Sequence, residues 1–224
     1  MNREFQHASV AIPHGPRAAI HGSPVIKRLG LVEYQLTYAA MRRFTDERSA
    51  TTADELWVLE HPSVYTAGLA ARKEHFPRGS DLRLERVDRG GQITYHGPGQ
   101  AVVYALVDLS REGLTVRAMV TLVEQAVIDT LAAHGVHAAR RSGAPGVYVN
   151  GAKVAALGFR VRRGCCYHGV ALNVNMDLAP FSAIDPCGYP GLAVTQTSAL
   201  GIAAGAEELG DALARGIARG IYKP

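Results

Sequence analysis

The chain has 224 residues, of which 47% are hydrophobic and 20% are charged, so it can bury a full core and is expected to form one domain. It has no apolar run of the length that crosses a bilayer, and its start, MNREFQHASV, lacks the apolar stretch of a secretory signal. A membrane-spanning helix is therefore excluded, and a soluble cytoplasmic protein without a membrane partner is expected. Its net charge is +4, and no recognised nucleic-acid motif or basic-aromatic pattern is present, so nucleic acid is not an expected partner either.

The first elements are an irregular arm and a helix. Residues 1–24 mix His, Pro, Gly and Ala without periodicity, which predicts a mobile arm and leaves 25–224 as the folded domain. Residues 31–48 have apolar side chains at helical spacing, with Leu31 and Tyr34 at the start of the stripe. A helix that packs this stripe against the core is predicted there.

The middle of the chain is predicted to be rich in strands. ELWVLEHP at 55–62 is continuously apolar in its centre and ends at a proline, which predicts a buried strand. Three further strands are predicted at 85–88, 92–96 and 101–109, separated by glycine-rich turns. The short connections favour antiparallel pairing.

The second half contains two helices and a meander. A helix is predicted from Thr115, which can cap it, to Gly135, and a second helix over 206–221. Between them, Asn150-Gly151 is a strong hairpin signal, and another reversal is expected near Gly164. Hairpins outnumber crossovers, so the predicted class is α+β, with helices packed on a mainly antiparallel or mixed sheet.

Glycine-rich segments beside strands mark a candidate ligand site. RGGQITYHGPGQ at 89–100 places glycines where a ligand could approach the backbone closely. Tight turns alone explain some of these glycines, but not Arg89, His96 and Gln100 among them. A phosphate-binding loop would lead into a helix, whereas this segment leads into a strand, so a nucleotide is disfavoured.

Cys187 lies between Pro186 and Gly188, at a turn and not inside an apolar element. Lys153 stands in phase with apolar residues of a predicted strand, although a solvated lysine at the hairpin tip is the simpler interpretation. An ammonium ~4 Å from a thiolate contributes up to ~4 kcal/mol at an effective dielectric constant near 20. Lys153 could therefore activate Cys187 as a nucleophile.

The remaining cysteines and histidines suggest no metal site. His96 and His168 could each face a cleft, but a structural histidine is the more frequent case. Cys165 and Cys166 are adjacent, point to opposite faces of a strand and are expected to be structural. Neither C-x-x-C nor H-x-x-x-H spacing occurs in the required pattern, so no metal is expected.

Four motifs in order resemble the bacterial octanoyltransferase family, also called lipoyl(octanoyl) transferases or lipoate-protein ligase B. They are RGGQITYHGPGQ at 89–100, GAKVAALG at 151–158, HGVALNVN at 168–175 and PCG at 186–188. The resemblance covers about residues 26–222 and implies the single-domain fold of the biotin and lipoate protein ligases. It also implies protein lipoylation without a cofactor or ATP.

The resemblance implies a role for each motif. The octanoyl group would pass from acyl carrier protein through a thioester on Cys187 to a lysine of a lipoyl domain. The acceptors would be the lipoyl domains of 2-oxoacid dehydrogenase complexes and the H protein of the glycine cleavage system. Lys153 would lower the pKa of the thiol, and either Lys153 or His96 could deprotonate the acceptor amine. The implied substrate-binding residues are Arg89, Gly90, Gly91, Gln92, Ile93, Thr94, Tyr95, His96, Ala156, Leu157, Gly158, Gly169, Val170 and Ala171.

Two other functions remain open at this point. An ATP-dependent lipoate or biotin protein ligase would share the fold but need no cysteine, and a catalytically inactive module could bind acyl carrier protein alone. A run of arginines, Arg160 to Arg163, with the nearby Arg140, is either a docking surface for an acidic protein or a solvated strand face.

Overall fold

The computed structural model describes residues 23–77, 81–185 and 191–222. The arm predicted over 1–24 therefore lies outside the described residues except for its last two positions, and Cys187 lies outside them as well.

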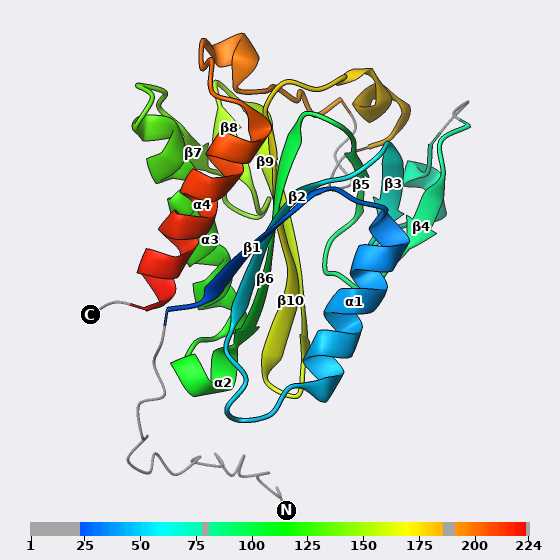
Figure 1. Ribbon diagram of the computed structural model, residues 1–224. Helices are drawn as coiled ribbons and strands as arrows, with labels where there is room; N and C mark the ends of the chain where they lie inside the picture. The colour runs from blue at the N-terminus through cyan, green and yellow to red at the C-terminus, as the bar shows by residue number, and fades with distance from the viewer. Residues whose placement is uncertain (1–22, 78–80, 186–190, 223–224) are drawn as a thin grey trace, which may run out of the picture.

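A seven-stranded mixed sheet forms the centre of the described part of the chain (Figure 1). Its first two strands are parallel, and the other neighbouring strands are antiparallel. The strands, in spatial order, are β1 (Val25–Leu31), β2 (Glu55–Glu60), β6 (Gln100–Asp108), β10 (Cys165–Asn173), β9 (Ala152–Arg162), β8 (Val147–Val149) and β7 (Ala139–Arg140).

A second, three-stranded sheet lies beside the first and carries part of the glycine-rich motif. Its order is β4 (Leu84–Arg86), β3 (Val64–Ala67) and β5 (Ile93–His96). Tyr65 and Tyr95 from this sheet pack with Phe181 in a small apolar cluster of their own.

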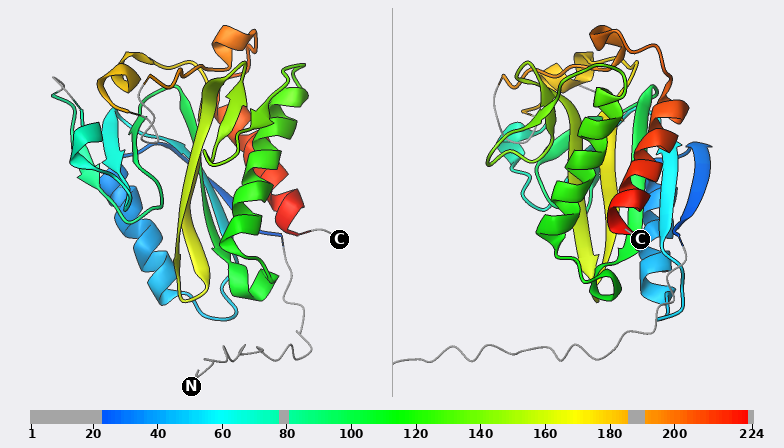
Figure 2. Two further views of the ribbon diagram at one scale, coloured as in Figure 1. Left: turned by 180° about the vertical axis from the view of Figure 1, so that it is seen from behind. Right: turned by 90° about the vertical axis from the view of Figure 1, so that its left-hand side faces the viewer.

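Helices cover both faces of the large sheet. Helices α3 (Val116–Ala132) and α4 (Ala206–Ile221) lie on one face, and α1 (Tyr34–Glu47) lies on the other (Figures 1 and 2). The remaining helices are short: α2 (Leu109–Glu112), η1 (Lys73–His75), η2 (Ala179–Ala183) and η4 (Ser198–Leu200). None of the described helices is both long enough and apolar enough to cross a membrane.

The local signals for α3 and the meander are confirmed. The Thr115 hydroxyl oxygen accepts a hydrogen bond from the backbone N–H of Ala118, which caps α3 as predicted. Asn150 and Gly151 have φ of 49° and 82°, so the hairpin between β8 and β9 has the left-handed backbone that this pair of residues favours. The reversal at Gly164, with φ of 80°, then joins β9 to β10.

The α+β class is confirmed, but three strands were not predicted: β1, β3 and the two-residue β7. Strand β1 is an edge strand whose side chains are almost all exposed, so its sequence lacks the alternation that identifies a half-buried strand. Leu31 belongs to this strand and is 60% exposed, so its assignment to the buried stripe of the helix was wrong. Strand β3 has four residues, all buried, and is too short to show a period.

A buried carboxylate ties several elements together at the end of the sheet opposite β5. Asp54 accepts hydrogen bonds from the Arg48 side chain, the backbone N–H of Asp108 and the Tyr222 hydroxyl, and it pairs with Arg111. Its side chain is 1% exposed. Asp54 therefore connects the ends of α1, β6 and α4 with α2.

Candidate active site

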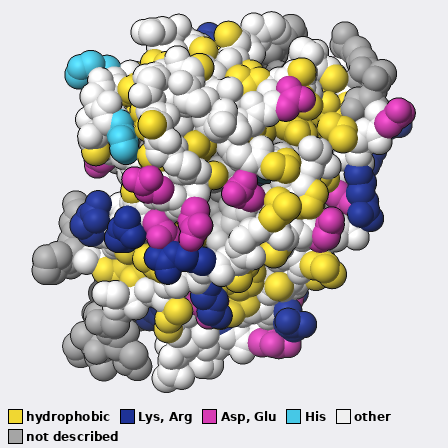
Figure 3. Space-filling model, turned by 45° about the horizontal axis from the view of Figure 1, so that its top comes forward, with side chains coloured by type: hydrophobic (Ala, Val, Ile, Leu, Met, Phe, Trp, Pro, Cys, Tyr) yellow, Lys and Arg dark blue, Asp and Glu magenta, His cyan; other side chains and the backbone are white. Residues whose placement is uncertain are grey.

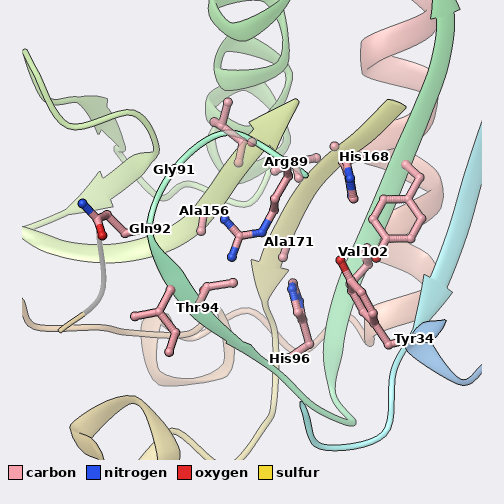
Figure 4. A pocket seen from close by; sticks show the side chains of 16 residues that line it. Tyr34, Arg89, Gly91, Gln92, Thr94, His96, Val102, Ala156, His168 and Ala171 are labelled. Atoms are coloured by element: carbon pink, nitrogen blue, oxygen red, sulfur yellow. The ribbon is translucent and has the colours of Figure 1, made fainter. Parts of the chain in front are cut away.

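A narrow pocket of about 60 Å³ lies between the two sheets, on the face of the large sheet that carries α1 (Figure 4). Its floor consists of β9, β10 and β6, and its cover is the segment that runs from Arg89 into β5. All but two of the predicted substrate-binding residues line it, namely Arg89, Gly91, Gln92, Ile93, Thr94, His96, Ala156, Leu157, Gly158, Gly169, Val170 and Ala171.

The two predicted residues that do not line the pocket have structural contacts instead. The backbone N–H of Gly90 donates to the carbonyl oxygen of Phe159 at 3.0 Å, which holds the cover against β9. Tyr95 is 2% exposed, and its hydroxyl forms a hydrogen bond with Ser63. Its ring packs in the apolar cluster of the small sheet, with Tyr65 and Phe181.

Arg89 fixes the cover to the small sheet. Its Nη2 donates to the carbonyl oxygen of Thr66 at 2.6 Å and to the Thr66 hydroxyl at 2.9 Å, and its Nη1 donates to Gly90. The guanidinium is thus bonded to β3 at the same time as it lines the pocket.

Gly158 allows the cover to approach β9 closely. A Cβ atom at this position would lie 2.7 Å from the carbonyl oxygen of Gly90, a distance that real side chains do not adopt. The absence of a side chain at Gly158 is therefore a steric requirement of the pocket.

Four further residues line the pocket that were not among the predicted substrate-binding residues: Tyr34, Val102, Tyr104 and His168. All four are almost fully buried, between 1% and 4% exposed. In the sequence, Tyr34, Val102 and Tyr104 look like ordinary core residues, whereas His168 could also face a cleft, although a structural role is the more frequent case. Only the crossing of α1, β6 and β10 brings them to one place.

The pocket has an open side and a closed end, which differ in exposure and chemistry. The open side of the pocket consists of exposed or partly exposed residues, of which Ala156 is the nearest to Lys153 along β9; they are Gly91, Gln92, Thr94, Ala156, Leu157 and Gly158. Tyr34 and His168 are buried and belong to the closed end, where Figure 4 shows the Tyr34 hydroxyl directed into the pocket.

The buried histidines near the closed end are neutral. His61 Nδ1 lies 2.6 Å from the carbonyl oxygen of Val32, so Nδ1–H donates and Nε2 accepts from the Tyr104 hydroxyl at 2.7 Å. Burial lowers the pKa of His61 to about 4. Burial is the main cause that lowers the pKa of His96 to about 3, and the neighbouring His61 is the second cause.

These shifts predict acid sensitivity. His61 and His96 have folded-state pKa values below the unfolded value of about 6.5, so below about pH 6 the unfolded chain binds more protons. The free energy of unfolding should fall by about 1.4 kcal/mol per pH unit for each histidine between about pH 6 and 4.5. Urea denaturation across this range measures the slope. His96→Gln should reduce it, whereas His134→Gln, at an exposed position, should leave it unchanged.

His168 is hydrogen-bonded to a carboxylate at the edge of the pocket. Its Nε2 lies 3.0 Å from Asp88 Oδ1, and the Tyr167 hydroxyl donates to the other oxygen of Asp88. Burial raises the pKa of Asp88, but these hydrogen bonds have the larger effect and bring that pKa below its ordinary value. Burial lowers the pKa of His168, so a neutral ring donating Nε2–H to an ionised Asp88 is the expected state.

Lys153 is buried, not solvated at the hairpin tip. It is 3% exposed, its Nζ donates to the carbonyl oxygen of Pro145 at 2.9 Å, and Nζ lies 5.1 Å from the centre of the Tyr148 ring. Gly146 leaves room for it, since a Cβ there would lie 2.9 Å from Lys153 Cε.

The chain that follows Cys187 returns to Lys153. The backbone N–H of Lys153 donates to Ala193 at 2.8 Å, and its carbonyl oxygen accepts from Thr195 at 2.9 Å. Residues 193–195 therefore run along β9 at Lys153, while Cys187 itself lies outside the described residues.

The arginines do not form one basic surface. Arg162 and Arg163 both pair with Asp46 at 2.9 Å, and Arg140 pairs with Glu124 on α3. On the face shown in Figure 3, Lys and Arg side chains stand beside Asp and Glu side chains. The solvated strand face is thus the better description of this arginine run.

Cys165 and Cys166 are both buried in β10 and line no part of the pocket. Burial raises the pKa of both thiols, that of Cys166 to about 12, so neither is a thiolate at neutral pH. Among residues 23–77, 81–185 and 191–222, no group of three or more His, Cys, Asp or Glu side chains could hold a metal ion.

Comparison with solved structures agrees with the fold. Lipoate-protein ligase A bound with ATP superposes with a TM-score of 0.74 at 15% identity, covering 89% of this chain and 85% of that one. Biotin protein ligase from Aquifex aeolicus gives a TM-score of 0.56 at 14% identity, covering 89% of this chain and 71% of that one. The biotin and lipoate protein ligase fold expected from the sequence is confirmed.

Comparison of sequences identifies the family. Residues 33–218 match the lipoyl protein ligase A/B catalytic domain. The octanoyltransferase of Thiobacillus denitrificans is 56% identical, over 95% of this chain and 98% of its own length. That of Dechloromonas aromatica is 58% identical, over 86% of this chain and 94% of its own length. The chain therefore belongs to the lipoyl protein ligase A/B family and, within it, to the octanoyltransferases.

Proposed function

We propose that this enzyme transfers the octanoyl group in two steps through a thioester on Cys187, with Lys153 as its acid-base partner. The observation that carries the proposal is the buried Lys153 ammonium on β9, the strand that also lines the pocket and along which the chain after Cys187 returns. The donor is octanoyl-acyl carrier protein, and the acceptor is a lysine of a lipoyl domain. A cytoplasmic location is part of the same proposal.

In the first step the Cys187 thiolate attacks the carbonyl carbon of the donor thioester. The new carbon–sulfur bond forms as the bond to the carrier thiol breaks, and the carrier thiolate takes a proton from the Lys153 ammonium. One thioester replaces another, so the step needs no ATP. The pair begins as thiolate and ammonium and ends as thioester and neutral amine.

In the second step the neutral Lys153 takes a proton from the acceptor ammonium. The freed amine attacks the Cys187 thioester, the amide bond forms, the carbon–sulfur bond breaks and one further proton leaves to solvent. Cys187 returns as thiolate beside the Lys153 ammonium. His96 is the weaker candidate for this base, because its pKa is about 3 and both of its ring nitrogens have hydrogen-bond partners.

The pocket suits a medium-length acyl chain. Val102, Ala156 and Ala171 supply apolar walls, and about seven buried carbons at ~0.8 kcal/mol each would contribute ~5 to 6 kcal/mol to binding. The chain would enter at the open side, with its carbonyl group toward Lys153.

Intact-mass analysis tests the acyl-enzyme directly. Incubation with octanoyl-acyl carrier protein, without ATP, should add one octanoyl group that hydroxylamine removes, and Cys187→Ala should abolish it. A Cys187→Ser variant that attached free octanoate with ATP at the full rate would instead identify an ATP-dependent ligase. Carrier-protein binding without any adduct or transfer would identify an inactive binding module.

The close contact at Gly158 gives a test of the pocket. Gly158→Ala should push the Gly90 carbonyl away from β9 and lower kcat/KM for octanoyl transfer by about tenfold or more, because the cover of the pocket must shift. Gly205→Ala is the matched control, since nothing lies within 4 Å of the added methyl group. Equal kcat/KM values for the two variants and the unmodified enzyme would contradict this assignment.

A further inference from the structure

The closed end of the pocket contains a buried acceptor without a donor. His168 is 1% exposed, and no described residue lies within hydrogen-bond distance of its Nδ1. Because Nε2–H donates to Asp88, Nδ1 carries a lone pair and is an acceptor. Nε2 is held by Asp88, which does not line the pocket, so Nδ1 is the ring nitrogen that can face the pocket.

A hydroxyl group is directed toward the same part of the pocket. The His168 ring lies 6.2 Å from the Tyr104 ring, and Figure 4 shows the Tyr34 hydroxyl directed toward the same part of the pocket. A buried acceptor beside a hydroxyl group is the environment in which proteins hold an ordered water. A purely hydrocarbon ligand would have no donor to offer there.

The backbone of His168 has an unfavourable conformation that the surrounding structure must maintain. His168 has φ of 64°, one of the few non-glycine positive φ angles among the described residues, and the residue after it is Gly169. A Cβ at Gly169 would lie 2.0 Å from the carbonyl oxygen of Val103, so β10 passes close to β6 at this point. Backbone strain of this kind concentrates at functional sites.

The distance to His168 from Ala156, the open-side lining residue nearest to Lys153 along β9, matches the length of the acyl chain that the proposed function requires. Ala156 lines the open side, and His168 pairs with Phe159, three residues further along β9, which is about 10 Å. Seven extended carbon–carbon bonds of about 1.5 Å each span about 9 Å. An octanoyl chain that starts at the open side would stop short of the imidazole.

We propose that His168 is a specificity-determining residue: with Tyr34 it holds a water at the closed end, and this polar stop limits the acyl chain to about eight carbons. This inference rests on the proposed transfer function. A ninth carbon would gain roughly fourfold in affinity from its own burial. By displacing the water it would leave Nδ1 unpaired, which costs roughly fivefold to more than a hundredfold. Asp88 acts as a positioning residue, because it fixes which nitrogen carries the proton.

A pair of substrates of equal length tests the stop on the unmodified enzyme. Nonanoyl and 8-hydroxyoctanoyl pantetheine thioesters have the same number of heavy atoms in the acyl chain, but only the second ends in a hydrogen-bond donor. The hydroxyl can replace the water and donate to Nδ1. We expect kcat/KM for acylation, measured by intact mass, to be at least tenfold higher for 8-hydroxyoctanoyl than for nonanoyl. A preference for nonanoyl would overturn the proposal, because an apolar end disfavours a buried hydroxyl.

Two variants show whether His168 is the cause. His168→Phe keeps a ring but removes the acceptor, so the preference should reverse in favour of nonanoyl. Tyr167→Phe removes a different hydrogen bond to the same Asp88 without touching the pocket, so the preference should stay as in the unmodified enzyme. An unchanged preference in His168→Phe would assign the effect to another group. If His168→Phe does not fold, the comparison of the two thioesters on the unmodified enzyme still tests the polar stop.

The outcome is separable from that of the proposed function. Octanoyl pantetheine is the reference substrate: if it forms no adduct on Cys187, the transfer proposal fails. If it forms the adduct but the two longer probes show no tenfold preference for the hydroxylated chain, only the polar stop is rejected.

Discussion

Replacement of Lys153 by methionine is expected to lower the rate of octanoyl transfer at pH 7 by about a thousandfold or more. Without the ammonium, the Cys187 thiol returns to a pKa of about 8.5 and is only a few per cent thiolate at neutral pH. The loss of a positioned proton donor and acceptor removes about another hundredfold or more. The two effects act on the same reaction and multiply.

The fold should survive this change. Lys153 is 3% exposed, and methionine has a similar shape without a charge that must be buried. The measurement is acylation of Cys187 by octanoyl pantetheine as a function of pH, together with thermal unfolding. The residual rate of the variant should rise with pH through about 8.5, the ordinary thiol range, whereas the unmodified enzyme should already be active at lower pH. Lys27→Met, at a lysine whose side chain is 46% exposed, is the control. A Lys153→Met enzyme with near-normal activity and an unchanged pH profile would disprove the pairing.

The largest effect on stability is expected from Asp54→Asn. Asp54 and its partner Arg48 have side chains only 1% and 4% exposed, and Arg111 pairs with the same carboxylate. Removal of one partner leaves buried positive charge without compensation, which typically costs about 3 to 5 kcal/mol. Loss of the Tyr222 contact should also loosen the end of α4.

Urea denaturation at pH 7 measures this cost, and Asp46→Asn is its matched control. Asp46 also pairs with two arginines, but on the surface, where such pairs contribute about 0 to 1 kcal/mol. The pH dependence gives a second readout. Burial raises the pKa of Asp54, but its hydrogen bonds have the larger effect and bring that pKa below its ordinary value. The contribution of Asp54 to the free energy of unfolding is therefore present at neutral pH and is lost on acidification. Asp54→Asn should therefore flatten the acid limb of the stability curve, and a cost no greater than that of Asp46→Asn would contradict this account.

The sequence predicted those elements whose signals are local. Helix α4 was predicted at its observed bounds because its apolar residues repeat at helical spacing over sixteen residues. The Asn150-Gly151 hairpin followed from the turn preference of these two residues. Strand β1 was missed, since an exposed edge strand needs no apolar alternation. Its pairing with β2 depends on α1 crossing between them, which no local pattern encodes.

The residues of the candidate site also fall into two groups: those that the sequence predicted and those that only the fold brings together. The glycine-rich cover and the β9 and β10 segments were identified by resemblance, because they are contiguous motifs. Tyr34 and Tyr104 were missed, because each is an unremarkable aromatic residue in its own element. Burial of Lys153 could not be read from its place near a hairpin tip, since it depends on Gly146 and on the return of residues 193–195.

The position of β6 in the sheet has a consequence for how this chain folds. Strand β6 is hydrogen-bonded to β2 on one side and to β10 on the other, and Gln100 faces Asn173 across that second ladder. The centre of the sheet thus closes only after distant segments meet, a topology of high contact order that folds slowly. Until β10 arrives, the edge of β6 is an open template for other chains, and a nascent or truncated polypeptide that ends before β10 would be prone to aggregate.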